Sequence, residues 1–216
     1  MHGLASDQTA LTLVRVDQLA TEILARMVPL RFALARSAEE RIAVLRLRYQ
    51  VVTERGWSRP EDLPDGLERD IYDDHAEYVV AWDNATLIAA TRLVYPGSGL
   101  RLPTEEAFDL RIEPHGQVVD AGRFIVTRPY SDCEHRVLAA LLARTWLEVR
   151  QRGYSAICAA FAARSMIRLY SRMGFRVVQL GPPQHYWGEV RYPVRFDVLA
   201  AAPALLKRWG TPATEL

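Results

Sequence analysis

The sequence predicts a mixed α/β fold, in which a mostly antiparallel central sheet carries helices on both faces. The predicted elements run strand, helix, long loop, three strands, helix, strand, helix and two strands, which combines hairpins with helical crossovers. Residues 118–126, VVDAGRFIV, are apolar enough for a strand buried on both faces. The 216 residues, half of them hydrophobic, suffice for one domain of good size or one domain with a short appendage.

Composition excludes several classes of protein. A formal net charge of +1 gives no bulk field for nucleic acid or for a membrane surface. No apolar run approaches the ~18 residues of a membrane helix, and no charged-then-apolar leader opens the chain, so we expect a cytoplasmic protein. Cys133 and Cys158 fit a reducing compartment and lack metal-ligand spacing, and the five histidines form no cluster. We therefore expect no metal.

The chain divides into a helical extension over residues 1–28 and a single domain over residues 29–216. Residues 10–27 have apolar side chains near helical spacing, and Pro29 closes that segment. The spacing leaves three roles open for this helix: it packs on the body, swings as a lid, or contacts a partner.

The first half of the domain contains strands, one helix and a long loop. Residues 30–35 alternate as a short strand, and the Ser37/Glu40 capping box starts a helix that runs to Gln50. Residues 56–68 hold two prolines and two glycines and form a loop of the length that is often functional. A hairpin follows, with strands at residues 77–82 and 86–95, and the stretch 103–115 is predicted to be irregular.

The second half alternates helices and strands. The glycine of Met173-Gly174 is typical of the residue that follows a helix. Periodicity predicts strands at 118–126, 156–161, 176–181 and 191–200, and helices at 136–152 and 163–172.

Two charges interrupt the apolar strand 118–126. Charged side chains are seldom buried unless they are paired, so Asp120 and Arg123 need a reason to be there. They are three residues apart and point to opposite sides of the strand, unless Gly122 marks a bulge that re-aims one of them. The plain alternative is an ion pair that joins the strand to a helix.

The run from Ile167 to Phe175, IRLYSRMGF, follows a strand, turn, helix and strand and resembles the GCN5-related N-acyltransferase (GNAT) superfamily. The resemblance covers Leu30 to Asp197. It implies a sheet splayed at its middle, with a cleft for a pantetheine chain, and it implies that Tyr170 protonates the departing thiolate. The alternative is that Tyr170 is a core aromatic residue.

A finer resemblance covers Arg48 to Phe124. The pieces in order are Arg48, Trp57, Glu68-x-Asp70-x-Tyr72-Asp73, Arg92 and Asp120-x-x-Arg123-Phe124. This succession resembles acyl-homoserine-lactone (autoinducer) synthases of quorum sensing and the related N-acyl-amino-acid synthases. It implies transfer of an acyl group from acyl-carrier protein, or sometimes CoA, to a small amine such as S-adenosylmethionine or an amino acid.

Departures from these patterns bear on the product and the donor. Asp120 stands where autoinducer synthases usually carry Glu, Gly122 where they carry Ser, and about thirty residues precede the match. The turn at residues 129–136 has no glycine and two acids, where acetyltransferases hold the CoA pyrophosphate on backbone amides. The first group of departures bears on the homoserine-lactone product. The turn weakens ordinary CoA binding and favours delivery of the acyl group on a carrier protein.

The chemistry implied by the resemblance assigns roles to the residues. Asp120 is the candidate base, acting through water, Tyr170 is the acid, and amides near residues 124–127 are candidate oxyanion donors. Acidic side chains are expected to hold the acceptor ammonium and an arginine its carboxylate. The predicted substrate-binding residues are Arg48, Trp57, Asp70, Asp73, Arg92, Phe108, Arg123, Phe124, Ile125 and Val126.

Several of these residues have plainer readings. Asp70 and Asp73 suit a solvated turn, or with Arg92 they surround a polar acceptor pocket under the 56–68 loop. Arg48 is as suited to a structural pair with Asp70 as to a ligand. Competing functions are an acetyl-CoA-dependent transferase acting on a protein or drug, and a non-catalytic acyl-binding module. No permanently bound cofactor is expected.

Overall fold

A single sheet of eight strands organises the part of the chain that the computed structural model describes, residues 2–97, 99–131, 135–186 and 189–210. The side chains of 2–6 and 156–162 are left aside, so Cys133 and Cys158 lie outside the described side chains. The strands are β1 (Arg31–Leu34), β2 (Glu77–Asp83), β3 (Thr86–Val94), β4 (Val118–Val126), β5 (Ala156–Ala163), β6 (Val177–Gln179), β7 (Gln184–Tyr186) and β8 (Glu189–Phe196). The helices are α1 (His2–Ala25), α2 (Ala38–Glu54), α3 (Pro103–Phe108), α4 (Arg136–Gln151), α5 (Arg164–Arg172) and α6 (Val198–Trp209).

The strand order confirms a mixed, mostly antiparallel sheet. It reads β1-β2-β3-β4-β5-β8-β6, with β7 also paired to β8, and β4 with β5 is the parallel pair among these neighbours. That pair spans only two positions, Val118 opposite Ala156 and Val119 opposite Ile157. Beyond Val119 the two strands part, so the predicted splay at the middle of the sheet is confirmed.

A bulge in β4 lies just past this point. Gly122 is opposite Arg92 and Ile125 is opposite Ala90, so two residues of β4 share the place opposite Thr91. Arg123 takes up the bulge with a left-handed φ of 55°, and the Thr91 hydroxyl donates to the Gly122 carbonyl at 2.8 Å. The predicted bulge is therefore present, with the unusual backbone on Arg123 rather than on Gly122. It turns Arg123 to the sheet face that also carries Arg92.

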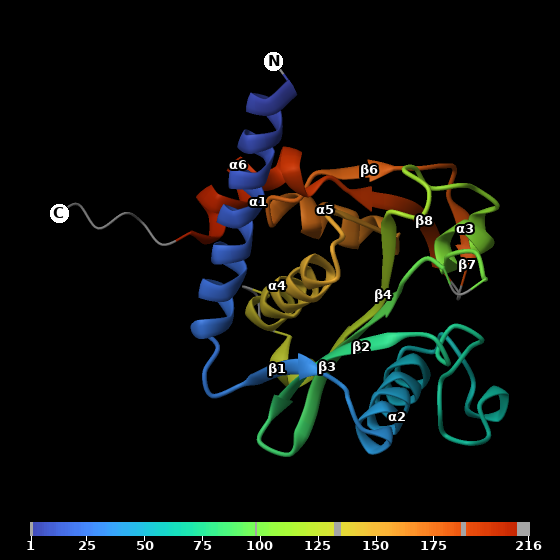
Figure 1. Ribbon diagram of the computed structural model, residues 1–216. Coiled ribbons are helices and arrows are strands. Elements are labelled where there is room, and N and C mark those ends of the chain that lie inside the picture. Colours follow the sequence, from blue (N-terminus) through green and yellow to red (C-terminus); the bar gives the residue numbers. More distant parts are fainter. Residues whose placement is uncertain (1, 98, 132–134, 187–188, 211–216) are drawn as a thin grey trace.

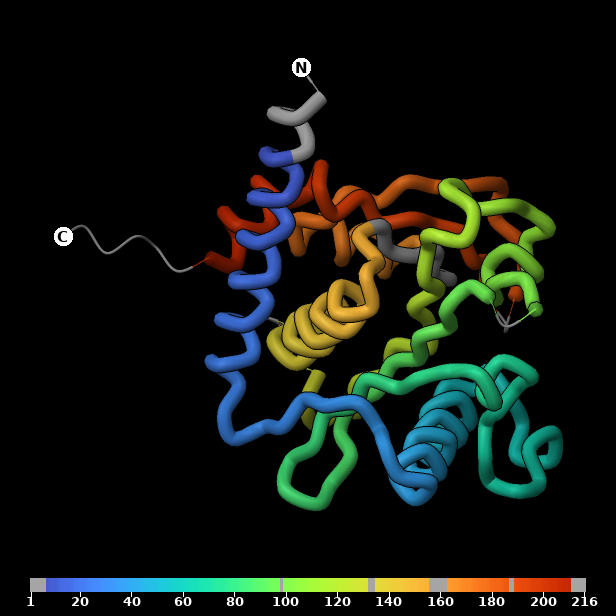
Figure 2. The backbone as a smooth tube through the Cα atoms, in the orientation of Figure 1, coloured from blue at the N-terminus to red at the C-terminus, as the bar shows by residue number. Residues whose placement is uncertain are grey.

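Helices cover both faces of the sheet (Figure 1). α2 packs on one face against a cluster that includes Tyr78, Val80 and Ile125, and its start is the predicted Ser37/Glu40 capping box. α4 packs on the other face against Val119 and other buried residues. α1 lies outside α4 and packs against both α4 and α6 (Figures 1 and 2).

Several elements differ from the sequence-based expectation: among them, α1 begins at His2 instead of residue 10, and α2 ends at Glu54 instead of Gln50. The stretch 103–115 is not wholly irregular. The Leu102 amide donates to the Glu105 carboxylate at 3.1 Å, and the short helix α3 begins there. The last predicted strand was drawn four residues too long: Asp197 accepts from the Ala200 amide at 3.0 Å and starts α6. The three-residue strand β7 was not predicted, since a pairing this short leaves no periodic pattern.

None of the helices in the described residues is long and apolar enough to cross a membrane.

Candidate active site

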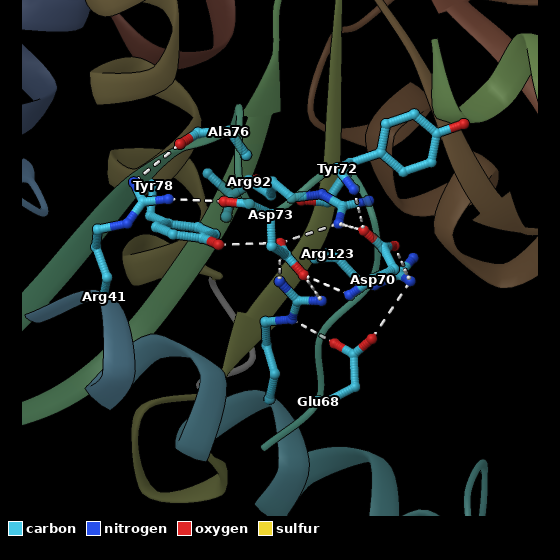
Figure 3. A network of polar contacts seen from close by, with 12 residues as sticks. Arg41, Glu68, Asp70, Tyr72, Asp73, Ala76, Tyr78, Arg92 and Arg123 are labelled. Carbon is cyan, nitrogen blue, oxygen red and sulfur yellow. Dashed lines mark hydrogen bonds and ion pairs between the residues drawn. The ribbon is translucent and has the colours of Figure 1, made fainter. Parts of the chain in front are cut away.

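Six charged side chains form a closed network on the α2 face of the sheet (Figure 3). Three are arginines, supplied by α2, β3 and β4, and three are acids on the segment that precedes β2. The members are Arg48, Arg92, Arg123, Glu68, Asp70 and Asp73.

Asp73 is the centre of the network. Its Oδ1 accepts from Arg48 Nη1 at 2.6 Å, from Arg92 Nη1 at 3.0 Å and from the Tyr78 hydroxyl at 2.9 Å. Its Oδ2 accepts from the Asp70 amide at 2.8 Å. Burial alone would raise the pKa of Asp73, but the Arg48 and Arg92 guanidinium groups outweigh it and lower that pKa to about 2. Asp73 is therefore ionised at every ordinary pH.

The other two acids connect the remaining arginines. Asp70 accepts from Arg92 Nη1 at 2.6 Å and from Arg123 Nη2 at 3.2 Å. Glu68 accepts from Arg48 Nε and, at 3.4 Å, from Arg123 Nη2. The left-handed backbone at Arg123 is what brings its guanidinium to these partners.

The network is balanced in charge and almost closed to solvent. Three guanidinium groups face three carboxylates, and the Arg48 and Arg92 side chains are 1% and 2% exposed. Arg48 binds Glu68 and Asp73, so the expected pair with Asp70 is replaced by this one. Charged groups that are buried must be paired with opposite charges. Here the three arginines are paired with the three acids of the same network. The arrangement favours a scaffold role, in which the network fixes the segment before β2 to α2 and the sheet.

A cavity of about 230 Å³ opens where β4 and β5 part. It is lined by Val52, Arg55, Trp57, Glu68, Gly122, Arg123, Phe124, Ile125, Val126, Tyr130, Ser131, His135, Leu138, Met166, Leu169, Tyr170, Tyr186 and Arg191. Half of the predicted site residues are on its wall, namely Trp57, Arg123, Phe124, Ile125, Val126 and Tyr170. We name this cavity the cleft.

The other predicted site residues lie off the cleft wall. Arg48 and Arg92 both bind Asp73, and Phe108 is the buried last residue of α3. Asp70 keeps 29% of its side chain exposed but also points into the network. The structure therefore does not show the expected polar pocket around Asp70, Asp73 and Arg92, and direct contact of these residues with an acceptor stays a prediction.

Asp120 is buried directly behind the cleft. Its Oδ2 accepts from the Thr104 amide at 2.9 Å and from the Thr104 hydroxyl at 2.7 Å. Burial raises the pKa of Asp120 to about 6, although the Thr104 hydrogen bonds and Arg92 pull it the other way. A Cβ on Gly122 would lie 3.5 Å from Asp120 Oδ1, and Gly122 lines the cleft. The carboxylate therefore packs next to Gly122, a residue of the cleft wall.

Tyr170 lies on α5 at the opposite wall. Its ring meets Phe196 edge-on at 5.1 Å and Phe175 at 6.2 Å, so its side chain is held by packing. Burial raises the pKa of the Tyr170 hydroxyl well above its usual value, which keeps the proton on the oxygen. A fixed, protonated hydroxyl on the cleft wall is suited to donate a proton.

The turn that was expected to weaken CoA binding is described in part. Arg128–Tyr130 form a short 3-10 turn, and Ser131 and His135 line the cleft. Asp132, Cys133 and Glu134 lie outside the described residues.

Sequence reasoning missed three residues of the site. Glu68 opens the acidic motif and lines the cleft, yet only the two aspartates were assigned to the acceptor. Thr104, the partner of Asp120, lies in a stretch read as irregular. Arg191 on β8 also lines the cleft, and no local pattern marks it.

Comparison with known proteins agrees with this geometry. The family model "N-acyl amino acid synthase FeeM" matches residues 43–194. No curated protein sequence matches the chain.

Solved structures of acyltransferases share the fold. BjaI, a CoA-dependent acyl-homoserine lactone synthase solved with SAM and isopentyl-CoA, has a TM-score of 0.61 and 23% identity over 82% of this chain and 85% of its own. The acyl-homoserine lactone synthase LasI has a TM-score of 0.62 and 20% identity over 87% of this chain and 97% of its own. FeeM, an N-acyl amino acid synthase from uncultured soil microbes, has a TM-score of 0.60 and 15% identity over 77% of this chain and 89% of its own.

These structural likenesses establish the GNAT-like fold. The family model matches most of the chain and therefore also establishes its family. The protein belongs to the FeeM family of N-acyl amino acid synthases and is an acyltransferase.

Proposed function

We propose that the protein transfers an acyl chain from a pantetheine thioester to the α-amine of an amino acid. The observation that carries this proposal is the cleft, which lies beside the part of β4 that has parted from β5 and is lined by Tyr170 together with Phe124 and Val126. The family supports an amino acid as the acceptor. We place the reaction in the cytoplasm, where acyl thioesters are made.

The reaction needs three groups around one carbonyl carbon. The amine nitrogen, after losing a proton through water to Asp120, attacks the thioester carbon and forms the N–C bond. The nitrogen of the adduct then gives up its second proton to water, the C–S bond breaks, and the thiolate takes the proton of the Tyr170 hydroxyl. Asp120 returns its proton to solvent, and Tyr170 recovers one from solvent.

The backbone of β4 offers the oxyanion donor. The Thr127 amide donates to the Ile88 carbonyl at 2.9 Å, on the β3 side. Since amides of an antiparallel strand alternate in direction, the Val126 amide points to the other edge, where β5 has parted from β4. Among the candidates 124–127, Val126 is the amide that this alternation favours for stabilising the oxyanion.

The acceptor end of the cleft carries both signs of charge. Glu68 and Arg123 line it beside Trp57, and the Trp57 indole donates to Glu189 Oε1 at 3.1 Å. In this proposal an ammonium lies near Glu68 and a carboxylate near Arg123. For the donor, carrier-protein delivery remains the proposal, because Ser131 and His135 offer little of a glycine-lined phosphate cradle.

Direct assay tests the proposal. Purified protein is incubated with dodecanoyl-carrier protein or dodecanoyl-CoA and either a mixture of amino acids or S-adenosylmethionine, and products are identified by mass spectrometry. An N-acyl amino acid is the expected product. An acyl-homoserine lactone would identify the autoinducer alternative, and absence of any acylated product with either donor would contradict the proposal.

The pH dependence of the reaction gives the first prediction. Because Asp120 must be ionised to act as a base, and its pKa is about 6, kcat/KM should rise about tenfold per pH unit below pH 6. Asp120→Asn should abolish this limb. Thr104→Val removes a hydrogen bond that lowers the pKa of Asp120, so the limb should move to higher pH.

The α-amine of a free amino acid titrates well above the pKa of Asp120, so its limb supplies an internal control. Its limb should be the same in all three proteins. If Thr104→Val leaves the lower limb where it is in the parent protein, Asp120 is not the group that titrates.

A further inference from the structure

α1 is docked on the body of the protein. The indole Nε1 of Trp146 on α4 donates to Asp17 Oδ1 at 2.6 Å, and Arg26 Nη1 donates to the Trp209 carbonyl of α6 at 2.9 Å. Beside these polar contacts, Leu13, Val16 and other apolar residues of α1 are buried against α4 and α6. Of the three roles that the sequence left open for this helix, the structure shows the packed one.

A second cavity lies beneath α1. It has a volume of about 80 Å³ and is enclosed by α1, α4, α6 and β4. Val16, Leu19, Ala20 and Ile23 form its α1 wall, and no charged residue is among the described residues that line it. We name it the apolar chamber. A site without charges gives an ammonium or carboxylate no partner and suits hydrocarbon.

The apolar chamber adjoins the cleft at a single residue of β4. Phe124 lines both cavities. Of two other residues on the same strand, Ala121 lines only the apolar chamber and Gly122 lines only the cleft. Phe124 is half-buried and has both cavities beside it, so its side chain is the partition between them. A chain attached to a thioester in the cleft would enter the apolar chamber past this ring.

We propose that the apolar chamber receives the distal end of the donor's acyl chain, and that α1 forms the wall that limits chain length. This inference rests on the proposed acyl transfer and adds a specificity role for a helix outside the family match, which begins at residue 43. Leu19 and Ala20 are the determining positions, because both are buried and line the apolar chamber.

Point variants of the intact protein test the wall. Ala20→Phe fills the apolar chamber, and Leu19→Ala enlarges it. Ala10→Phe is the matched control, because Ala10 is on the same helix, is exposed and lines neither cavity. Each protein is assayed with butanoyl, octanoyl, dodecanoyl and hexadecanoyl donors.

Ala20→Phe should keep the parent kcat/KM with short donors and lose about fourfold for each methylene that no longer finds a place. Leu19→Ala should shift the preference toward longer chains, and Ala10→Phe should match the parent protein. An unchanged chain-length profile in both Ala20→Phe and Leu19→Ala would overturn the inference. Leu19→Ala alone decides the matter if Ala20→Phe does not fold.

A binding measurement separates this inference from the proposed reaction. Dodecanoic acid brominated at its far end should quench tryptophan fluorescence, because Trp146 and Trp209 line the apolar chamber. Quenching that is strong in the parent and in Ala10→Phe but weak in Ala20→Phe would support the chamber even if no acyl transfer were found. Equal quenching in all of them, beside active transfer, would reject the chamber while leaving the proposed reaction standing.

Discussion

Tyr170→Phe is expected to lower kcat by about 10²–10⁴-fold while leaving the fold intact. The ring is held by its edge contacts with Phe175 and Phe196, and these do not involve the hydroxyl. Removing only the oxygen therefore removes the proton donor and keeps the packing. Steady-state rates at saturating donor, together with a melting curve, check both halves of this expectation.

A better leaving group distinguishes acid catalysis from a packing effect. A thiophenol ester expels a thiolate that needs no proton, so the deficit of Tyr170→Phe should shrink markedly with an acyl-thiophenol donor. Tyr154→Phe is the matched control, since Tyr154 is half-buried against Tyr95 at 5.5 Å and lies off the cleft. A deficit that stays the same with both donors would assign Tyr170 a structural role.

The sheet was predictable because its signals are local. The apolar runs of β2, β3 and β4 and the Gly174 at the end of α5 each act over a few residues. The splay followed from the order of elements seen in the superfamily. By contrast, α3 spans six residues and β7 three, which is too short to leave a periodic pattern.

From the sequence, residues of the site could be predicted, but their arrangement could not. The motif brought Arg48, Asp73 and Arg92 to attention, but sequence does not show whether such charges face a ligand or one another. That depends on the bulge at Arg123, which adds a third arginine to the face that holds three carboxylates. With the charges matched, the residues that remain for substrate are those on the cleft wall. Thr104 and Arg191 reach the site from distant elements, and no local pattern marks either residue.

Arg48→Ala is expected to be the most destabilising single substitution discussed here. It leaves Glu68 and Asp73 as buried carboxylates without their main partner, a change that costs about 3–5 kcal/mol of unfolding free energy. For a chain of this length, that loss corresponds to a fall in Tm of roughly 6–20 °C. Thermal unfolding followed by circular dichroism measures it.

The exposed pair of Arg59 and Asp62 supplies the matched control. It also joins an arginine to a carboxylate, at 2.9 Å, but the Arg59 side chain is 77% exposed. Exposed pairs of this kind contribute little to stability because solvent screens them, so Arg59→Ala should leave Tm nearly unchanged.

A second substitution tests the matched-charge explanation of the network itself. If the cost of Arg48→Ala comes from carboxylates left without a cation, then Glu68→Gln in the Arg48→Ala background should restore part of the lost stability. Glu68→Gln alone should be destabilising, because it unbalances the charges in the other direction, so the two effects are expected to be far from additive. The scaffold role also predicts that Arg48→Ala, assayed well below its Tm, keeps the acceptor KM of the parent protein. A Tm close to that of the parent, accompanied by a raised acceptor KM, would instead make Arg48 a ligand of the acceptor.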